Sequence, residues 1–163
     1  AVNAEQAQHK AFEVRSALPL SIMREESSFI PDIESYAGAL GLMQLMPRTA
    51  QAHDADIPGE ATPDRLSDPG VNIRVAVDHL FHLARQLTSH PVLITAAYNA
   101  GMGNLRRWTK ANPDRHIALF VEDIPSLQTR GYTKRVIGSY LAYQWLLGHD
   151  DFDTRVGLDA PTF

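Results

Sequence analysis

The stretch DPGVNIRVAVDHLFHLARQL, residues 68–87, gives the clearest indication of the fold. Its apolar stripe consists of Ile73, Val77, Leu80, Ala84 and Leu87. Steps of four and three residues place these side chains along one side of an α-helix. Asp68 followed by Pro69 is typical of an N-cap and a first helical position. The stretch therefore predicts an amphipathic helix.

Helical patterns also occur on both sides of this stretch. Ser89 and Pro91 predict the start of a helix that ends near Gly101 and Gly103. A long helix is expected over residues 128–147, with Gly148 as its C-terminal stop.

Nearer the N-terminus, Ser16 is expected to cap a core helix that ends between Ser27 and Pro31, with Pro19 in its first turn. A short helix is expected to begin at Pro47 and to end by Asp56.

The segment from Ile30 to Met46 has no helical period, and Gly38 and Gly41 indicate tight turns or a small hairpin. Residues 56–69, with three prolines, are interpreted as a surface connection. We therefore predict a mainly α domain with a small irregular or β-like segment beside the first core helix.

Composition narrows the classes of function. The 163 residues suit a single domain over 1–163, and with no cysteine the chain has neither disulfides nor thiolate metal sites. A net charge of −4 argues against a nucleic-acid partner, and Arg106, Arg107 and Lys110 are interpreted as a solvated helix face. No apolar run approaches the length of a membrane span, and residues 1–10 carry no signal-peptide pattern.

Two adjacent carboxylates, Glu25 and Glu26, lie near the end of the first core helix. Neighbours on a helix point about 100° apart, so only one of them can face inward. Glu26 follows Ile22 by four and Met23 by three, which places it on the apolar face. Burial would raise its pKa and make it a general acid near neutral pH. An ordinary surface glutamate would fit the same local spacing.

Three further segments carry polar side chains in apolar surroundings. Gln44 lies in an apolar string, where its amide either bonds to backbone or faces a cleft that binds sugar. Tyr98 and Asn99 either end a helix or line such a cleft, and Tyr132 is either a core tyrosine or a ligand contact. Gly38 and Gly41 would allow the backbone to approach a ligand closely.

Histidine spacing raises the question of a metal site. His79 and His82 share a helix face beside Asp78, but no further motif completes a zinc set, and we interpret them as surface histidines. The acidic tail at 150–153 lacks the glycine and glutamate of a calcium loop. We expect no cofactor and no metal.

Together these segments resemble the catalytic domain of soluble-type lytic transglycosylases, which is related in fold to goose-type lysozyme. The resemblance covers about residues 16–147. The matching segments are Arg24-Glu-Glu-Ser27, Gly41-Leu-Met-Gln-Leu-Met-Pro47, Asp68-Pro-Gly-Val-Asn-Ile73, Ala97-Tyr-Asn-Ala-Gly101 and Arg130-Gly-Tyr132.

The resemblance implies a lysozyme-like α-helical fold and a catalytic role for Glu26. It also implies that six residues line a glycan cleft: Ser35, Gln44, Met46, Tyr98, Asn99 and Tyr132. The implied reaction cleaves the β-1,4 bond between N-acetylmuramic acid and N-acetylglucosamine and leaves a 1,6-anhydro ring. The implied partners are peptidoglycan strands and muropeptides, in the periplasm or cell envelope of a bacterium. A longer multidomain or membrane-associated protein fits this reading.

Two alternatives stay open. A goose-lysozyme-like hydrolase would want a second carboxylate, for which Asp32 and Glu34 are candidates. A non-catalytic peptidoglycan-binding module would keep the cleft without the acid. One departure from the family pattern, Gln128 in place of a glutamate, bears on the preference for stem peptides.

Overall fold

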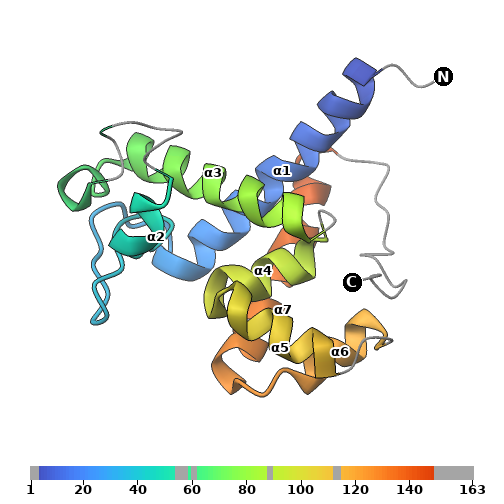
Figure 1. Ribbon diagram of the computed structural model, residues 1–163. Helices are drawn as coiled ribbons and strands as arrows, with labels where there is room; N and C mark the ends of the chain where they lie inside the picture. The colour runs from blue at the N-terminus through green and yellow to red at the C-terminus, as the bar shows by residue number, and fades with distance from the viewer. Residues whose placement is uncertain (1–3, 54–58, 60–61, 88–89, 112–114, 149–163) are drawn as a thin grey trace.

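The computed structural model describes residues 4–53, 59, 62–87, 90–111 and 115–148, with side chains from residue 16 onward. These residues form seven α-helices and one 3-10 helix (Figure 1). The elements are α1 (Ala4–Ser27), α2 (Pro47–Gln51), η1 (Pro63–Arg65), α3 (Pro69–Gln86), α4 (Pro91–Ala100), α5 (Met102–Ala111), α6 (Ile117–Asp123) and α7 (Leu127–Leu146). The mainly α prediction is confirmed.

Helix α4 forms the centre of the packing. All six residues from Val92 to Ala97 are buried, which is the pattern of a helix surrounded by protein on every side. It packs against α3, α5 and α7, and α7 also packs along α1 (Figure 1). The polar end of α4, with Tyr98 and Asn99, therefore lies where several helices meet.

Helix α3 begins as predicted. The Asp68 carboxylate accepts a hydrogen bond of 2.9 Å from the backbone N–H of Val71, and Pro69 occupies the first turn. The buried face is rotated from the predicted stripe, because Ile73, Val77 and Ala84 are only half-buried. The residues that are fully buried are Val71, Asn72, Val75, Ala76, Leu80, Leu83 and Leu87.

Helix α1 differs from its prediction at the N-terminal end. It ends at Ser27 as expected, but it begins at Ala4, so Ser16 does not cap it and Pro19 lies in its interior. Residues 4–15 are rich in alanine, glutamine and glutamate, which favour helix strongly enough to continue past the proline. The Ser21 hydroxyl donates a 2.6 Å hydrogen bond to the carbonyl of Ala17, one turn earlier.

Other boundaries follow or refine the predictions. Helix α2 ends at Gln51, and part of the expected extension toward Asp56 lies outside the described residues, as does Ser89 before α4. Gly101, with φ of 81°, ends α4, and Gly148, with φ of 75°, follows α7. Helix α6 was not predicted. In the described part of the chain, no helix has the length and apolarity to cross a membrane.

The segment between α1 and α2 is the predicted β-like element. Isolated antiparallel bridges pair Leu40 with both Glu34 and Leu45. Gly38 and Gly41 have φ of 80° and 73°, which glycine adopts without steric cost. The segment lies beside the C-terminal end of α1 (Figure 1), where Glu26 is located.

Candidate active site

Glu26 lies in the last turn of α1, and that turn is anchored to the β-like segment. The Ser27 hydroxyl lies 2.8 Å from the carbonyl oxygen of Leu42 and 3.1 Å from that of Met23. Ser27 is buried, so these contacts are shielded from water. They hold the neighbouring Glu26 at a defined position against the loop.

The Glu26 carboxyl is half-buried and bonded to α7. The Tyr132 hydroxyl donates a 2.7 Å hydrogen bond to its Oε1. Burial raises the pKa of Glu26 from 4.5 to about 7, the Tyr132 bond opposes this, and the charge of Glu25 adds to it. The carboxyl can therefore both give and accept a proton near neutral pH.

Glu25 also contacts α7, but at a different residue from Glu26. Its Oε1 pairs with the Arg135 guanidinium on α7, at 2.6 Å. Both carboxylates are half-buried, and they differ in their partners: Glu25 pairs with an exposed guanidinium, whereas Glu26 accepts from a buried tyrosine.

Two tyrosine hydroxyls lie close to this carboxyl. Burial raises the pKa of both Tyr98 and Tyr132 well above the usual range, and the negative charge of Glu26 adds to each shift. Both hydroxyls thus remain donors throughout the physiological range. Tyr132 donates to Glu26, whereas Tyr98 donates to the backbone carbonyl of Met43 at 2.7 Å.

Asn72 on α3 holds the β-like segment in place, a role that was missed in the sequence. Its Oδ1 accepts from the Met43 N–H at 2.8 Å, and its Nδ2 donates to the carbonyls of Leu40 and Leu66, each at 2.9 Å. Gly41 packs directly on it, because a Cβ at this position would lie 2.4 Å from Asn72 Nδ2. The sequence predicted that the Gly41 backbone would approach a ligand closely. In the structure it approaches Asn72 and the Leu66 carbonyl instead.

A pocket of about 560 Å³ opens between the β-like segment, α3 and α4. Four of the six predicted cleft residues line it: Gln44, Met46, Tyr98 and Asn99. Glu26 does not line the pocket, but the charge of Glu26 acts on the Tyr98 hydroxyl, so Tyr98 connects the pocket to the carboxyl.

The polar groups of the pocket also stabilise the fold. Gln44 adopts φ of 46°, and its Nε2 donates to the carbonyls of Ile33 and Gly41 at 3.0 and 2.9 Å. Gln44 therefore satisfies both alternatives: its amide bonds to backbone carbonyls, and the residue lines the pocket. Asn99 Oδ1 accepts a 2.9 Å hydrogen bond from the Thr129 hydroxyl on α7.

The other two predicted residues lie outside the pocket wall. Tyr132 contacts Glu26 instead, as described above. The Ser35 hydroxyl accepts a 2.9 Å hydrogen bond from the Ala39 N–H, and its backbone N–H donates to the Ala39 carbonyl at 2.9 Å. Ser35 therefore closes the turn at Gly38. Asp32 and Glu34, the candidates for a second carboxylate, are exposed loop residues.

Histidines on α3 form part of the pocket wall. His82 is exposed, as expected of a surface histidine, whereas the burial of His79 was not anticipated. His79 and His82 both line the pocket, and His79 is half-buried. Among the residues that the structure describes, no group of three or more histidine, aspartate or glutamate side chains is arranged to hold a metal ion.

The helical fold with a carboxyl beside a pocket places this protein in the lysozyme-like α class. Its family follows from a match of residues 3–121 to the Transglycosylase SLT domain model. The chain belongs to this family.

Individual relatives agree with this assignment. The chain is 38% identical over 140 residues to the soluble lytic murein transglycosylase of Escherichia coli strain K12, covering 83% of this chain and 22% of that protein. It is 29% identical to the membrane-bound lytic murein transglycosylase C of Mannheimia succiniciproducens, covering 83% and 44%.

Solved structures also match. The 70-kDa soluble lytic transglycosylase of E. coli superposes with a TM-score of 0.78 at 37% identity, over 81% of this chain and 22% of that one. The lytic transglycosylase Slt of Pseudomonas aeruginosa, solved as an inactive mutant, gives 0.77 at 36% identity, over the same shares. The chain thus spans about a fifth of the length of these soluble relatives.

Proposed function

We propose that this chain is the catalytic part of a lytic transglycosylase that cleaves the β-1,4 bond between N-acetylmuramic acid and N-acetylglucosamine in peptidoglycan. The observation that carries the proposal is the half-buried Glu26, with a pKa of about 7 and a bond to Tyr132. The family and the names of its relatives support the same activity. A relative that is inactive with a glutamate-to-glutamine change supports an essential glutamate in this family.

The proposed reaction uses Glu26 twice. The protonated carboxyl first donates its proton to the glycosidic oxygen, and the bond from that oxygen to the anomeric carbon breaks. The substrate's own N-acetyl carbonyl stabilises the positive anomeric carbon, in place of a second protein carboxylate. The Glu26 carboxylate then takes the proton of the C6 hydroxyl, whose oxygen bonds to the anomeric carbon and closes the 1,6-anhydro ring. No water is consumed.

The neighbouring residues suit these two steps. The Tyr132 hydroxyl stabilises the carboxylate in the interval when it is ionised, and burial drives it to recover a proton afterward. We propose that Gln44, Met46, Tyr98 and Asn99 contact the glycan along the pocket, and that Ser35 and Tyr132 complete the cleft. Peptidoglycan as the substrate supports a location in the periplasm or envelope of a bacterium. The 22% share of the soluble relative that the chain covers supports its being part of a longer protein.

The products of sacculus digestion test this function against hydrolysis. Transglycosylation should release 1,6-anhydro muropeptides, which mass spectrometry distinguishes because each is lighter by one water than its hydrolysed counterpart. Only hydrolysed ends would favour the goose-lysozyme alternative. Binding to sacculi without release of any muropeptide would favour a non-catalytic module.

The pH dependence of kcat/KM should report the pKa of Glu26 in the free enzyme. Because the first step needs the protonated acid, we expect kcat/KM to fall above about pH 7, by about tenfold per pH unit. The variant Tyr132→Phe removes the hydrogen bond that lowers this pKa, so the falling limb should move to higher pH. Rates on soluble glycan strands measured across pH check both statements.

Tyr140→Phe is the matched control for this experiment. Tyr140 is also a buried tyrosine on α7, but its hydroxyl contacts Gln144 and not Glu26. Its variant should leave the falling limb in place. A limb that stays fixed in Tyr132→Phe, or that moves to lower pH, would contradict the role of this hydrogen bond.

A further inference from the structure

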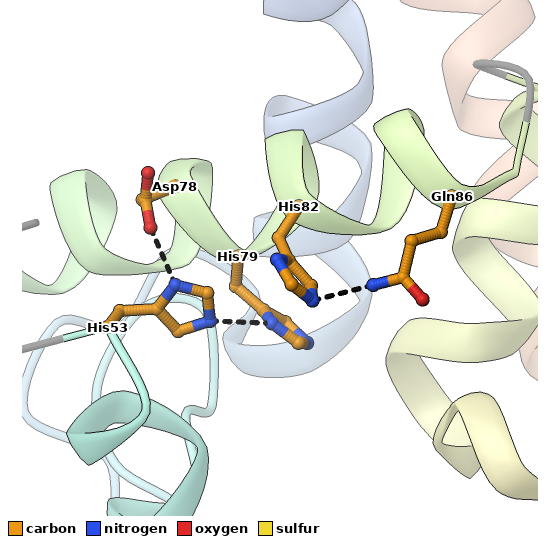
Figure 2. Close-up of polar contacts among 5 residues, drawn as sticks. All are labelled: His53, Asp78, His79, His82 and Gln86. Atoms are coloured by element: carbon orange, nitrogen blue, oxygen red, sulfur yellow. Dashed lines mark hydrogen bonds and ion pairs between the residues drawn. The ribbon is translucent and has the colours of Figure 1, made fainter.

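Helix α3 places His79 and His82, one turn apart, in the wall of the pocket. Figure 2 shows both rings together with Asp78 and Gln86 of α3 and His53, which follows α2. The His79 ring also packs against Tyr98, with ring centroids 5.6 Å apart. Both histidines therefore line the same pocket as Tyr98, although the proposed reaction gives the two histidines no role.

A chain of hydrogen bonds determines which nitrogen of His79 carries its proton. The Asp78 carboxylate lies 2.5 Å from His53 Nδ1, so Nδ1 must be the protonated nitrogen of His53. In a neutral imidazole with its proton on Nδ1, Nε2 is an acceptor, and the Nε2 of His53 lies 3.0 Å from His79 Nδ1. His79 therefore holds its proton on Nδ1, and its Nε2 is left with a lone pair.

This lone pair has no protein partner among the described residues, and it lies on the side of the ring away from His53 (Figure 2). Burial lowers the pKa of His79 to about 4, with smaller contributions from His53 and His82, so the ring is neutral at physiological pH. The charge of Asp78 acts in the opposite direction and raises the pKa of His79. A neutral ring keeps Nε2 an acceptor.

The second histidine is already engaged. The Arg106 guanidinium donates to Gln86 Oε1 at 2.9 Å, which directs the amide nitrogen of Gln86 toward His82 Nε2 at 2.6 Å. His82 Nε2 is therefore an acceptor that the protein itself satisfies. Of the two pocket histidines, His79 is the one whose acceptor nitrogen is available to a ligand.

We propose that His79 Nε2 is a binding site for a hydrogen-bond donor of an N-acetylated sugar, either a hydroxyl or the amide N–H. Asp78 and His53 are positioning residues that hold His79 in the required tautomer. The identity of the ligand as a glycan rests on the proposed function. The tautomer and the available acceptor do not rest on it, because they follow from the distances above for a neutral His53 ring.

Imidazole nitrogen NMR on the intact chain tests the tautomer without any substrate. We expect His53 and His79 both to carry their proton on Nδ1, with Nε2 unprotonated. In Asp78→Asn the charge that orients His53 is gone, so a larger share of His79 should carry its proton on Nε2. Asp64→Asn, which removes an exposed acid from η1, is the control and should change neither ring. A proton on His79 Nε2 in the unmodified protein would overturn the proposal.

Binding of chitotetraose, the β-1,4 tetramer of N-acetylglucosamine, tests the site in a Glu26→Gln background that cannot turn it over. His79→Phe keeps a ring of similar shape but has no acceptor, so Kd should rise about two- to tenfold, the effect of one neutral hydrogen bond. Asp78→Asn should raise Kd by a smaller factor, and Asp64→Asn should leave it unchanged. Thermal melts establish that each variant is folded.

The outcomes separate this proposal from the proposed function. Unchanged chitotetraose binding in His79→Phe overturns the His79 site, whereas release of anhydro muropeptides by the wild-type chain would still support transglycosylation. The absence of tetramer binding in the parent protein also overturns the His79 site. Digestion of sacculi then decides whether the function fails with it.

Discussion

Glu26→Gln is expected to lower kcat on peptidoglycan by about a hundredfold to ten-thousandfold, which is the usual contribution of a general acid or base. The amide has the shape of the carboxyl but can neither donate a proton to the glycosidic oxygen nor accept one from the C6 hydroxyl. Release of anhydro muropeptides from sacculi, measured by mass spectrometry over time, checks this. Wild-type rates in this variant would end the assignment of Glu26.

The same variant should be more stable than the wild type at neutral pH. The folded-state pKa of Glu26 is about 7, against 4.5 ordinarily, so its ionisation favours the unfolded chain. That contribution to stability is fully present below about pH 4.5 and is lost as the pH rises through about 7. The shift corresponds to about 3 kcal/mol at most. In urea unfolding at pH 4.5 and pH 8, the free energy of unfolding of Glu26→Gln should exceed that of the wild type only at pH 8.

Glu25→Gln is the control for both measurements. Glu25 is the adjacent carboxylate and pairs with the exposed Arg135 guanidinium of α7. Its variant should retain kcat within about threefold, because an exposed ion pair contributes little. It should also move the falling limb of the pH profile slightly to lower pH, since the charge of Glu25 raises the pKa of Glu26. A loss of activity as large as that of Glu26→Gln would show that the neighbours had been assigned the wrong way round.

Asn72→Ala is expected to destabilise the fold by about 2 kcal/mol or more. The side chain is fully buried and makes three hydrogen bonds, to Met43, Leu40 and Leu66. Alanine leaves the Met43 N–H and the Leu66 carbonyl without this partner, whereas the Leu40 carbonyl still accepts from the Leu45 N–H. Each unsatisfied buried group costs about 1–3 kcal/mol unless water enters. Urea unfolding followed by circular dichroism measures the change in the free energy of unfolding.

Asn104→Ala is the control, and it tests whether removing any helical asparagine lowers the stability as much as Asn72→Ala does. Asn104 is only half-buried, donates to the Ala100 carbonyl and accepts from Arg107 on the same helix. We expect its loss to cost less than about 1 kcal/mol. If Asn72→Ala is no more costly than Asn104→Ala, the β-like segment must be held by packing alone, and Asn72 would lose its assigned role.

Local geometry explains what could be predicted from the sequence. Asp68 and Pro69 begin α3 as expected, because a cap needs only a carboxylate and the next few N–H groups. The separation of Glu25 from Glu26 likewise follows from the 100° step between helical neighbours. In the β-like segment, glycine is the residue that accepts positive φ without strain, so turns at Gly38 and Gly41 were predictable as well.

Other features depend on residues that are distant in the chain, so no local pattern could reveal them. Tyr132 reaches Glu26 across 106 positions of sequence, and only the packing of α7 along α1 brings the two together. The histidine spacing on α3 was visible, but His53 comes from another part of the chain, and only the tertiary structure brings it within 3.0 Å of His79. The pKa of Glu26 likewise depends on how far the packed structure excludes water from its carboxyl. The sequence thus determines which side chains are available, whereas the surroundings that set their pKa and hydrogen bonds arise only when the helices pack.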